Sequence, residues 1–280
     1  MEFQTVTLGT APTRTVTVGA SRAAIICPLQ GPDNSTLVSS ARTIAASPCD
    51  IVEWRVDTFA STQENVLRGA LQVLRRELTV PLVATARSHS EGGGTAPENY
   101  STIVRALIDA GVDAVDIEMS APAAVDLIDY ALARHTPVIL SSHDFVGTAG
   151  IEQLLDQFTR MQHTLRERIT RATQTKSAET IAEWESRGWG IVKIATTPQN
   201  SMDVFKLMVA ARRFVDTVAT LPIIAIAMGR LGQVSRAYPQ TLGSSATFAS
   251  VPGESSAPGQ ISIDALARFD ESTHCLQAPF

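Results

Sequence analysis

The sequence predicts an α/β fold, a (β/α)8 TIM barrel preceded by a β-hairpin, from two observations. Short apolar runs rich in β-branched residues recur along the 280 residues, and longer stretches with helical spacing of apolar residues separate them. Regular alternation of strand and helix is typical of parallel βαβ units, and eight such units suit a closed barrel of about 250 residues. We therefore expect one barrel domain over residues 1–280.

The predicted strands are the apolar runs, and the helices fill the intervals between them. The strands are Ala23–Leu29, Asp50–Val56, Pro81–Ala86, Ala114–Glu118, Pro137–Ser141, Ile191–Ala195, Pro222–Ala227 and, less clearly, Leu242–Ala249. Helical spacing covers Thr62–Leu78, Asn99–Ala110, Ala121–Arg134, Ile151–Gln162 and Met202–Val218. Ahead of the first strand, Phe3–Leu8 and Thr13–Val18 flank the turn residues Gly9 to Pro12, which predicts a hairpin that caps the barrel bottom.

One interval between predicted strands is longer than the others. It holds about 50 residues between the fifth and the sixth strand and includes the mixed-charge stretch His163–Arg187. We predict a second helix there, an insertion around residues 163–188, and favour a solvated surface helix over a role in assembly or lid movement. The Gly/Ser/Pro-rich stretch Ser250–Gly259 is either a connector, which composition slightly favours, or a loop of the active site.

Composition excludes several classes of function. The chain is 44% hydrophobic and 18% charged with a formal net charge of −5, so no gross attraction to nucleic acid or to an anionic membrane is expected. The cysteines Cys27, Cys49 and Cys275 lack the spacing of a disulfide framework or a zinc site. No apolar run reaches the ~18 residues of a membrane helix. We expect a cytoplasmic protein without a metal, in which an anionic substrate would need local cations.

Charged residues interrupt the second predicted strand. The period of two places Glu53, Arg55 and Asp57 on one side and Trp54 and Val56 on the other, so three charges are expected to point into the barrel. Buried charges must be paired in any protein, and a structural network is therefore one interpretation. The other is that Glu53 and Arg55 hold substrate hydroxyls.

Lys193 lies within an apolar strand, where an ammonium is costly unless it is paired or neutral. The chain has only three lysines, and the other two, Lys176 and Lys206, fall in helical stretches. An amine that loses its proton can attack a carbonyl carbon, which an arginine cannot do. A lysine that forms a covalent imine and a structurally paired lysine are the two interpretations.

Further polar residues follow predicted strands, where a barrel carries its catalytic groups. His143 comes directly after the fifth strand and suits a general acid and base, although a bond to Asp144 alone would also explain it. The others are Arg87 with Glu91 and the run Gly92-Gly93-Gly94, then Asp116, Glu118 and Arg236. The glycines lack the pattern of a nucleotide site, and no metal-ligand cluster emerges.

These motifs follow one another in the order seen in the type I 3-dehydroquinate dehydratases, and the chain resembles that family. The first half carries Glu53–Asp57, Arg87-Ser88 with Glu91–Gly93, Asp116–Glu118, Ser142–Phe145 and Val192–Ala195. The second half carries Met228-Gly229, Ser235-Arg236, Gly243–Phe248 and Ser256–Gln260. Each string alone is weak, but their order and their positions at strand ends cover nearly the whole barrel.

The resemblance implies a chemistry that needs no cofactor. The substrate would be 3-dehydroquinate, dehydrated to 3-dehydroshikimate in the shikimate or quinate pathways. By this resemblance Lys193 forms an imine with the substrate ketone, and His143 moves protons for a syn elimination. Glu91, or alternatively Glu118, would orient or tune His143.

The resemblance also implies the binding residues and a homodimer. Arg236 would bind the substrate carboxylate, Glu53, Arg55 and Arg87 would hold ring hydroxyls, and Ser256 and Gln260 belong to a loop that closes over the substrate. Met228 is a further candidate. Two departures are the interval around 163–188, which is longer than the family spacing by roughly 20–25 residues, and Cys27-Pro28, which leaves one substrate contact unassigned.

Two other functions stay open at this point. A class I aldolase shares the barrel and the imine-forming lysine, although the Ser256–Gln260 loop argues against it. A catalytically silent relative that binds a metabolite as a regulator is the second, and the presence of both Lys193 and His143 argues against it.

Overall fold

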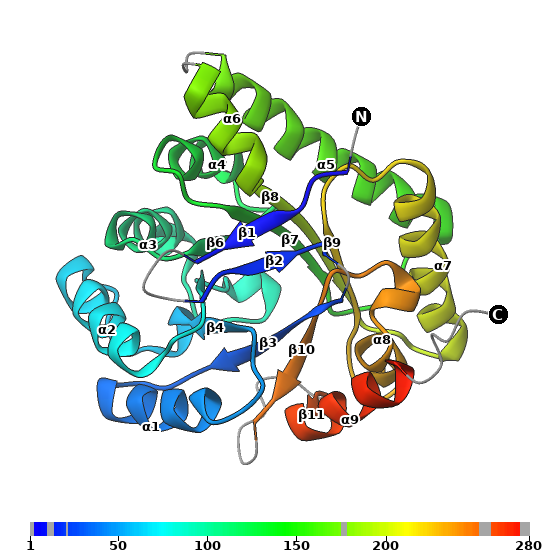
Figure 1. Cartoon of the computed structure of the whole chain (residues 1–280), viewed down its shortest axis with the longest axis horizontal. Helices are drawn as coiled ribbons and strands as arrows, with labels where there is room; N and C mark the ends of the chain where they lie inside the picture. Colours follow the sequence, from blue (N-terminus) through cyan, green and yellow to red (C-terminus); the bar gives the residue numbers. More distant parts are fainter. Residues whose placement is uncertain (1–2, 10–13, 21, 175–177, 252–258, 275–280) are drawn as a thin grey trace.

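The computed structural model describes residues 3–9, 14–20, 22–174, 178–251 and 259–274, and it confirms the predicted barrel (Figure 1). Parallel strands follow one another around the ring in chain order, and the last pairs with the first. A bridge between Ile223 and Ser244 joins the two remaining edges. The ring consists of β3 (Ala24–Leu29), β4 (Ile51–Arg55), β5 (Leu82–Thr85), β6 (Ala114–Glu118), β7 (Val138–Asp144), β8 (Gly190–Thr196), β9 (Ile223–Ala227) and β10 (Ala246–Ser250), and β11 (Ile261–Ser262) pairs with β10.

Helices surround this ring of strands (Figure 1). They are α1 (Asn34–Ala45), α2 (Glu64–Glu77), α3 (Pro97–Ala110), α4 (Ala124–Ala133), α5 (Ile151–Thr173), α6 (Ala178–Arg187), α7 (Ser201–Thr217), α8 (Gln233–Ala237) and α9 (Ile263–His274), with short 3-10 helices at Val56–Thr58, His89–Glu91 and Gln240–Leu242. Asp33 and Asn200 cap α1 and α7 by accepting a backbone N–H. Within the described residues, each helix is too short or too polar to cross a bilayer.

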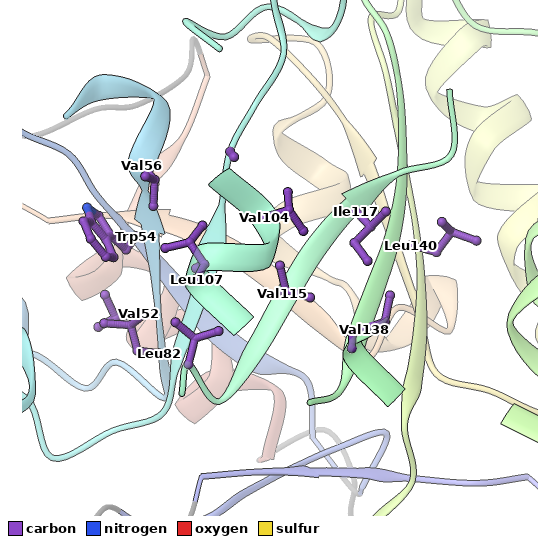
Figure 2. Close-up of a cluster of buried hydrophobic side chains, with 14 of the residues drawn as sticks. Val52, Trp54, Val56, Leu82, Val104, Leu107, Val115, Ile117, Val138 and Leu140 are labelled. Carbon is purple, nitrogen blue, oxygen red and sulfur yellow. The ribbon is translucent and has the colours of Figure 1, made fainter. Parts of the chain in front are cut away.

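Alternate residues of each strand enter two separate apolar layers. Outward residues such as Trp54, Val115 and Leu140 pack against the helices, and Figure 2 shows Val115 close to Val104 of α3. Inward residues fill the lower half of the barrel. Because side chains alternate along a strand, the next inward positions toward the carboxyl ends are the polar ones, including Asp116 and Lys193.

A short hairpin lies against the lower end of the barrel, as predicted. Its strands β1 (Val6–Leu8) and β2 (Val16–Val18) are antiparallel, and they cross the ring in Figure 1. Val6, Leu8 and Val18 are almost fully buried and belong to the same apolar cluster as the inward side chains of the barrel. The hairpin therefore closes the barrel at the end opposite the polar residues.

Several boundaries differ from the prediction, and three of these differences have a clear physical reason or bear on the site. The fifth barrel strand extends to Asp144, so His143 lies on β7 and not in the following loop. Helix α5 continues past Gln162 to Thr173, because buried Leu165 and Ile169 prolong its apolar stripe, and α6 follows it. The last strand starts at Ala246 instead of Leu242, because Gln240–Leu242 form a 3-10 turn that ends at Gly243 with φ +75°.

Replacing Gly69 with alanine is expected to stabilise the protein. Gly69 lies inside α2, and an added Cβ there would meet no atom within 4 Å. Alanine in a helix interior is favoured over glycine by about 0.8–1.0 kcal/mol. Urea unfolding of Gly69→Ala should show a free energy of unfolding raised by about that amount, with an unchanged slope.

Gly188→Ala is the matched control for this substitution. Gly188 has φ +67°, and a Cβ there would lie 1.9 Å from the carbonyl oxygen of Thr5. This variant should unfold at lower urea than the native chain. Equal stability of the two glycine variants would contradict the packing described for α2.

Candidate active site

A cavity of about 400 Å³ opens at the carboxyl ends of the barrel strands. Its volume falls in the range of small-molecule sites. Most residues predicted for the site line this cavity, namely Glu53, Arg55, Arg87, Glu91, His143, Lys193, Met228, Arg236 and Gln260. Glu118 is buried outside the cavity wall, and Ser256 lies outside the described residues.

Lys193 reaches the cavity from the middle of β8. Its strand neighbours Ile191 and Ala195 belong to the inner apolar cluster, so Lys193 also points inward, and it is only 5% exposed. The Nζ atom donates to Asp116 Oδ2 at 3.1 Å and lies 3.7 Å from Glu53 Oε1. Two carboxylates therefore flank Lys193 in the cavity wall.

Phe248 of β10 completes the surroundings of this amine. Its ring centre lies 4.8 Å from Lys193 Nζ, a distance at which the ring face attracts a cation. The amine therefore has an apolar wall on the Phe248 ring and acidic groups at Asp116 and Glu53, an arrangement that suits a positive charge on Nζ.

Arg87 joins the acidic residues of the site from the end of β5. Its Nη2 donates to Asp116 Oδ1 at 3.0 Å, and its Nη1 donates to Glu118 Oε1 at 3.1 Å. Burial alone would raise the pKa of Asp116, but Arg87 and Lys193 outweigh burial and lower the pKa below its ordinary value. Ser141 donates to the same carboxylate at 2.6 Å. Asp116 is therefore held ionised between two cations.

His143 is bonded to Glu91. The Nδ1 atom lies 2.7 Å from Glu91 Oε2, and the ring of Phe145 stacks on the imidazole at 6.1 Å between centres. Glu91 and not Glu118 is thus the carboxylate beside His143. Burial, with Arg87 and Lys193 in support, lowers the pKa of His143 well below 6.5. A neutral imidazole with Nδ1 engaged retains Nε2 for a second partner.

Glu91 is held at the end of a 3-10 turn. Burial raises the pKa of its carboxyl group to about 7, and a hydrogen bond of 2.5 Å from Ser120 Oγ to Oε1 acts in the opposite direction. The next residue, Gly92, has φ +77°, and a Cβ there would lie 2.9 Å from the ring of Phe145. Glycine is required at this position because the backbone passes directly beside that ring.

Arg236 on α8 is a buried cation whose surroundings differ from those of Arg87. It is 3% exposed, and its Nη1 donates to the carbonyl oxygen of Phe248 at 3.5 Å. Among the described residues, no carboxylate forms an ion pair with it, and its Nε has no hydrogen-bond partner. Burial lowers the pKa of this guanidinium to about 10. A buried, uncompensated cation in a cavity wall is suited to an anionic ligand.

Glu53 and Arg55 lie on the inward face of β4, as the period of two predicts. Arg55 makes two bonds of 2.8 Å to Asp57, and Glu53 accepts a bond of 2.9 Å from Thr85. Each charge thus has a structural partner and also borders the cavity. The structural and the ligand-binding interpretations of this strand are compatible.

Three further residues at the site, Phe248, Thr197 and Ser120, have no role predicted from the sequence. The strand pattern around Phe248 contains the signal for an inward ring, since its outward neighbour Ala249 belongs to the outer core. Ser120 lies in a turn after β6, and the sequence carries no signal of its contact with Glu91. Cys27 is fully buried in the outer core and does not line the cavity.

The part of the chain that the structure describes holds no group of three or more His, Cys, Asp and Glu side chains arranged as a metal site. The acidic residues near Lys193 are instead engaged with Arg87, Lys193 and hydroxyl groups. Arginine and lysine are the counter-ions of this cluster.

Comparison with known proteins gives one consistent result. The family model described as type I 3-dehydroquinase matches residues 25–179 and 168–274. A 3-dehydroquinate dehydratase of Shigella flexneri serotype 5b is 34% identical over 265 residues, which cover 92% of this chain and 95% of that protein. One from Enterococcus faecalis is 31% identical over 263 residues, covering 91% and 94%.

Solved structures agree with the sequence relatives. A type I 3-dehydroquinate dehydratase from Clostridium difficile, solved with covalent modified comenic acid, superposes with a TM-score of 0.81 at 28% identity and covers 98% of this chain and 99% of that one. The enzyme from Geobacillus kaustophilus gives a TM-score of 0.79 at 26% identity, covering 94% and 95%. With a family model and relatives that span nearly all of its length, the chain belongs to the type I 3-dehydroquinase family.

Proposed function

We propose that this protein is a hydro-lyase that dehydrates 3-dehydroquinate to 3-dehydroshikimate through an imine at Lys193. Family membership supports the reaction, and one observation carries the mechanism: among the described residues, one lysine and one histidine border the same cavity, and each is bonded to its own carboxylate. The covalent modified comenic acid in the Clostridium difficile relative is a further support, because it shows covalent chemistry within the family.

In the first step, Lys193 passes a proton to His143, and its amine adds to the substrate ketone. The carbonyl oxygen takes that proton back from His143 and a second proton from the nitrogen, and it leaves as water. The resulting iminium nitrogen is positive, and it withdraws electrons from the neighbouring C2–H bond. Asp116 and Glu53 lie next to this nitrogen, and their negative charge would stabilise the cation where it develops. Arg87 offsets the charge of the same acids when the amine is neutral.

In the second step, His143 would act first as base and then as acid. Its lowered pKa leaves the ring neutral at physiological pH, so Nε2 can accept the C2 proton. The electrons of that C–H bond form the double bond, the C1 hydroxyl leaves, and His143 returns the proton to it as water. Hydrolysis of the imine consumes the water released at the start, so one water is lost per turnover.

The remaining residues of the cavity would bind the substrate. We assign the substrate carboxylate to Arg236, because this guanidinium is buried in the cavity wall without an acidic partner among the described residues. Glu53 and Arg55 would hold ring hydroxyls, and Met228 and Gln260 would border the ring. Both terminal nitrogens of Arg87 already bond to acids, so we infer that it mainly positions them.

The aldolase and the silent regulator are less well supported. Family membership favours the dehydratase, and the cavity contains both the amine and the acid/base pair that the elimination requires. Turnover of 3-dehydroquinate separates the enzyme from a regulator, and assays with aldol donors separate the two enzymes.

The cellular context is part of the same proposal. We infer one domain over residues 1–280 acting in the cytoplasm, where the two described thiols, Cys27 and Cys49, would stay reduced. The product belongs to the shikimate pathway, toward chorismate and the aromatic amino acids, or to quinate metabolism. Growth of a deletion strain without aromatic amino acids or with quinate as carbon source distinguishes the pathways, and cell fractionation checks the compartment.

Borohydride trapping is the direct test of the imine. Reduction turns an iminium into a stable amine, so the native chain treated with 3-dehydroquinate should gain the mass of one reduced adduct. Lys193→Ala should gain none and should lose turnover. Lys206→Ala is the control, because Lys206 is partly exposed and bonded to Asp203 on α7, and it should label like the native chain. No adduct on a native chain that turns over would contradict the mechanism.

Replacement of Arg236 is expected to weaken binding without weakening the fold. Arg236→Met removes the proposed carboxylate ligand, so KM should rise by about 100-fold or more. Its free energy of unfolding should stay the same or rise, since a buried cation without an acidic partner is lost. Steady-state kinetics and urea unfolding measure the two effects.

Arg87→Met is the contrasting variant for this experiment. It would leave buried carboxylates unpaired and should lower the free energy of unfolding by about 3–5 kcal/mol. An Arg236→Met variant that keeps its KM, or that loses as much stability as Arg87→Met, would sink the assignment of Arg236 to the substrate.

We also infer a homodimer, on the strength of the family resemblance. Sedimentation velocity at micromolar concentration should give a mass near twice the 29.9 kDa of one chain. A species of single-chain mass that turns over 3-dehydroquinate at the native rate would show that the monomer is the active form.

A further inference from the structure

Among the described residues, Ser120 is the one whose hydroxyl group donates to Glu91, the carboxylate beside His143. Its Oγ donates to Glu91 Oε1 at 2.5 Å, while Glu91 Oε2 lies 2.7 Å from His143 Nδ1. One carboxylate thus connects an exposed serine on one side with the partly buried histidine on the other. A change at Ser120 can therefore reach His143 without touching the substrate.

The charged groups around Glu91 come from three strands. They are Arg87 after β5 at 3.4 Å, Asp116 and Glu118 on β6, and His143 on β7, while Lys193 on β8 acts on His143. Burial and the two neighbouring acids favour the protonated form of Glu91, and Arg87 and Ser120 favour the ionised form. With a pKa of about 7, Glu91 is balanced between the two forms near neutral pH.

The state of Glu91 decides where neutral His143 carries its proton. An ionised Glu91 accepts from Nδ1–H, so Nε2 has a free lone pair and can take a proton from the substrate. A protonated Glu91 would donate to Nδ1 instead, which puts the ring proton on Nε2. In that form His143 can donate at Nε2 but cannot act as the base.

We propose that Ser120 is a positioning residue, which keeps Glu91 ionised and thereby holds the ring proton of His143 on Nδ1, with Nε2 available as the base. The hydroxyl is well placed for this, because Oε1 is the oxygen of Glu91 that faces away from the histidine bond. A hydrogen bond to a carboxylate favours its charged form. The inference rests on the proposed function, since it concerns the proton transfer in that reaction.

The test is the dependence of kcat/KM on pH for 3-dehydroquinate, measured for the native chain, Ser120→Ala, Ser120→Thr and Ser90→Ala. Loss of the hydroxyl should move the midpoint of the acidic limb to higher pH by about one unit. Below the limb, Ser120→Ala should then be about tenfold slower, and on the alkaline side it should match the native chain. Ser120 is exposed, so its truncation leaves no cavity in the core.

The two other variants test whether the shift of the acidic limb is due to the Ser120 hydroxyl group. Ser120→Thr keeps a hydroxyl and should restore the native limb. Ser90 is also exposed and precedes Glu91, but its hydroxyl bonds to Ser88 and not to the carboxylate, so Ser90→Ala should follow the native profile. An unmoved limb in Ser120→Ala, or an equal shift in Ser90→Ala, overturns the proposal.

A second readout does not depend on turnover. The ring 15N chemical shifts of His143 in the free enzyme report which nitrogen carries the proton, and the pH of the switch from Nδ1–H to Nε2–H should rise in Ser120→Ala. If the native chain does not dehydrate 3-dehydroquinate, the proposed function fails, and this measurement alone decides the part played by Ser120. An identical switch in both chains would overturn the inference even where turnover is normal.

Discussion

The guanidinium of Arg87 is the interaction on which the site depends. It bonds to Asp116 and Glu118 and lies 3.4 Å from Glu91, and it is 4% exposed. Several acids cannot share a buried region unless a cation accompanies them, because desolvation of a carboxylate costs several kcal/mol. With Arg87 in place, Asp116 can hold Lys193 and Glu91 can hold His143. The amine and the imidazole are therefore positioned through a common ion, although they lie on different strands.

The cavity has a charge asymmetry that follows from this arrangement. The acids gather around Arg87 and Lys193, whereas Arg236 is buried at the cavity wall with no acidic partner in the described part of the chain. Such a cavity distinguishes the two ends of a small ligand that carries a carboxylate at one end and a ketone at the other. Under the proposed function, substrate binding falls to Arg236 and imine formation to Lys193, so that a substitution at one of them need not disturb the other.

The sequence predicts the parts of the site that depend on position along one strand. The apolar setting of Lys193 and the alternation at Glu53 and Arg55 indicate inward side chains, and the structure places all three at the cavity. Contacts between side chains of different strands could not be predicted from the sequence, since they depend on strand register and on side-chain length. The choice between Glu91 and Glu118 as partner of His143 and the bond from Ser120 are of this kind. The same limit explains the boundary at Ala246, where a 3-10 turn that ends at Gly243 interrupts an apparent strand.

The hairpin at the lower end of the barrel closes the cavity on that side. Val6, Leu8 and Val18 complete an apolar filling beneath the polar residues, so traffic to Lys193 passes through the carboxyl end of the barrel. Substrate must enter through this opening, and product and the released water must leave through it. Release of product and entry of the next substrate therefore cannot occur at the same time. Any molecule bound in the opening slows both.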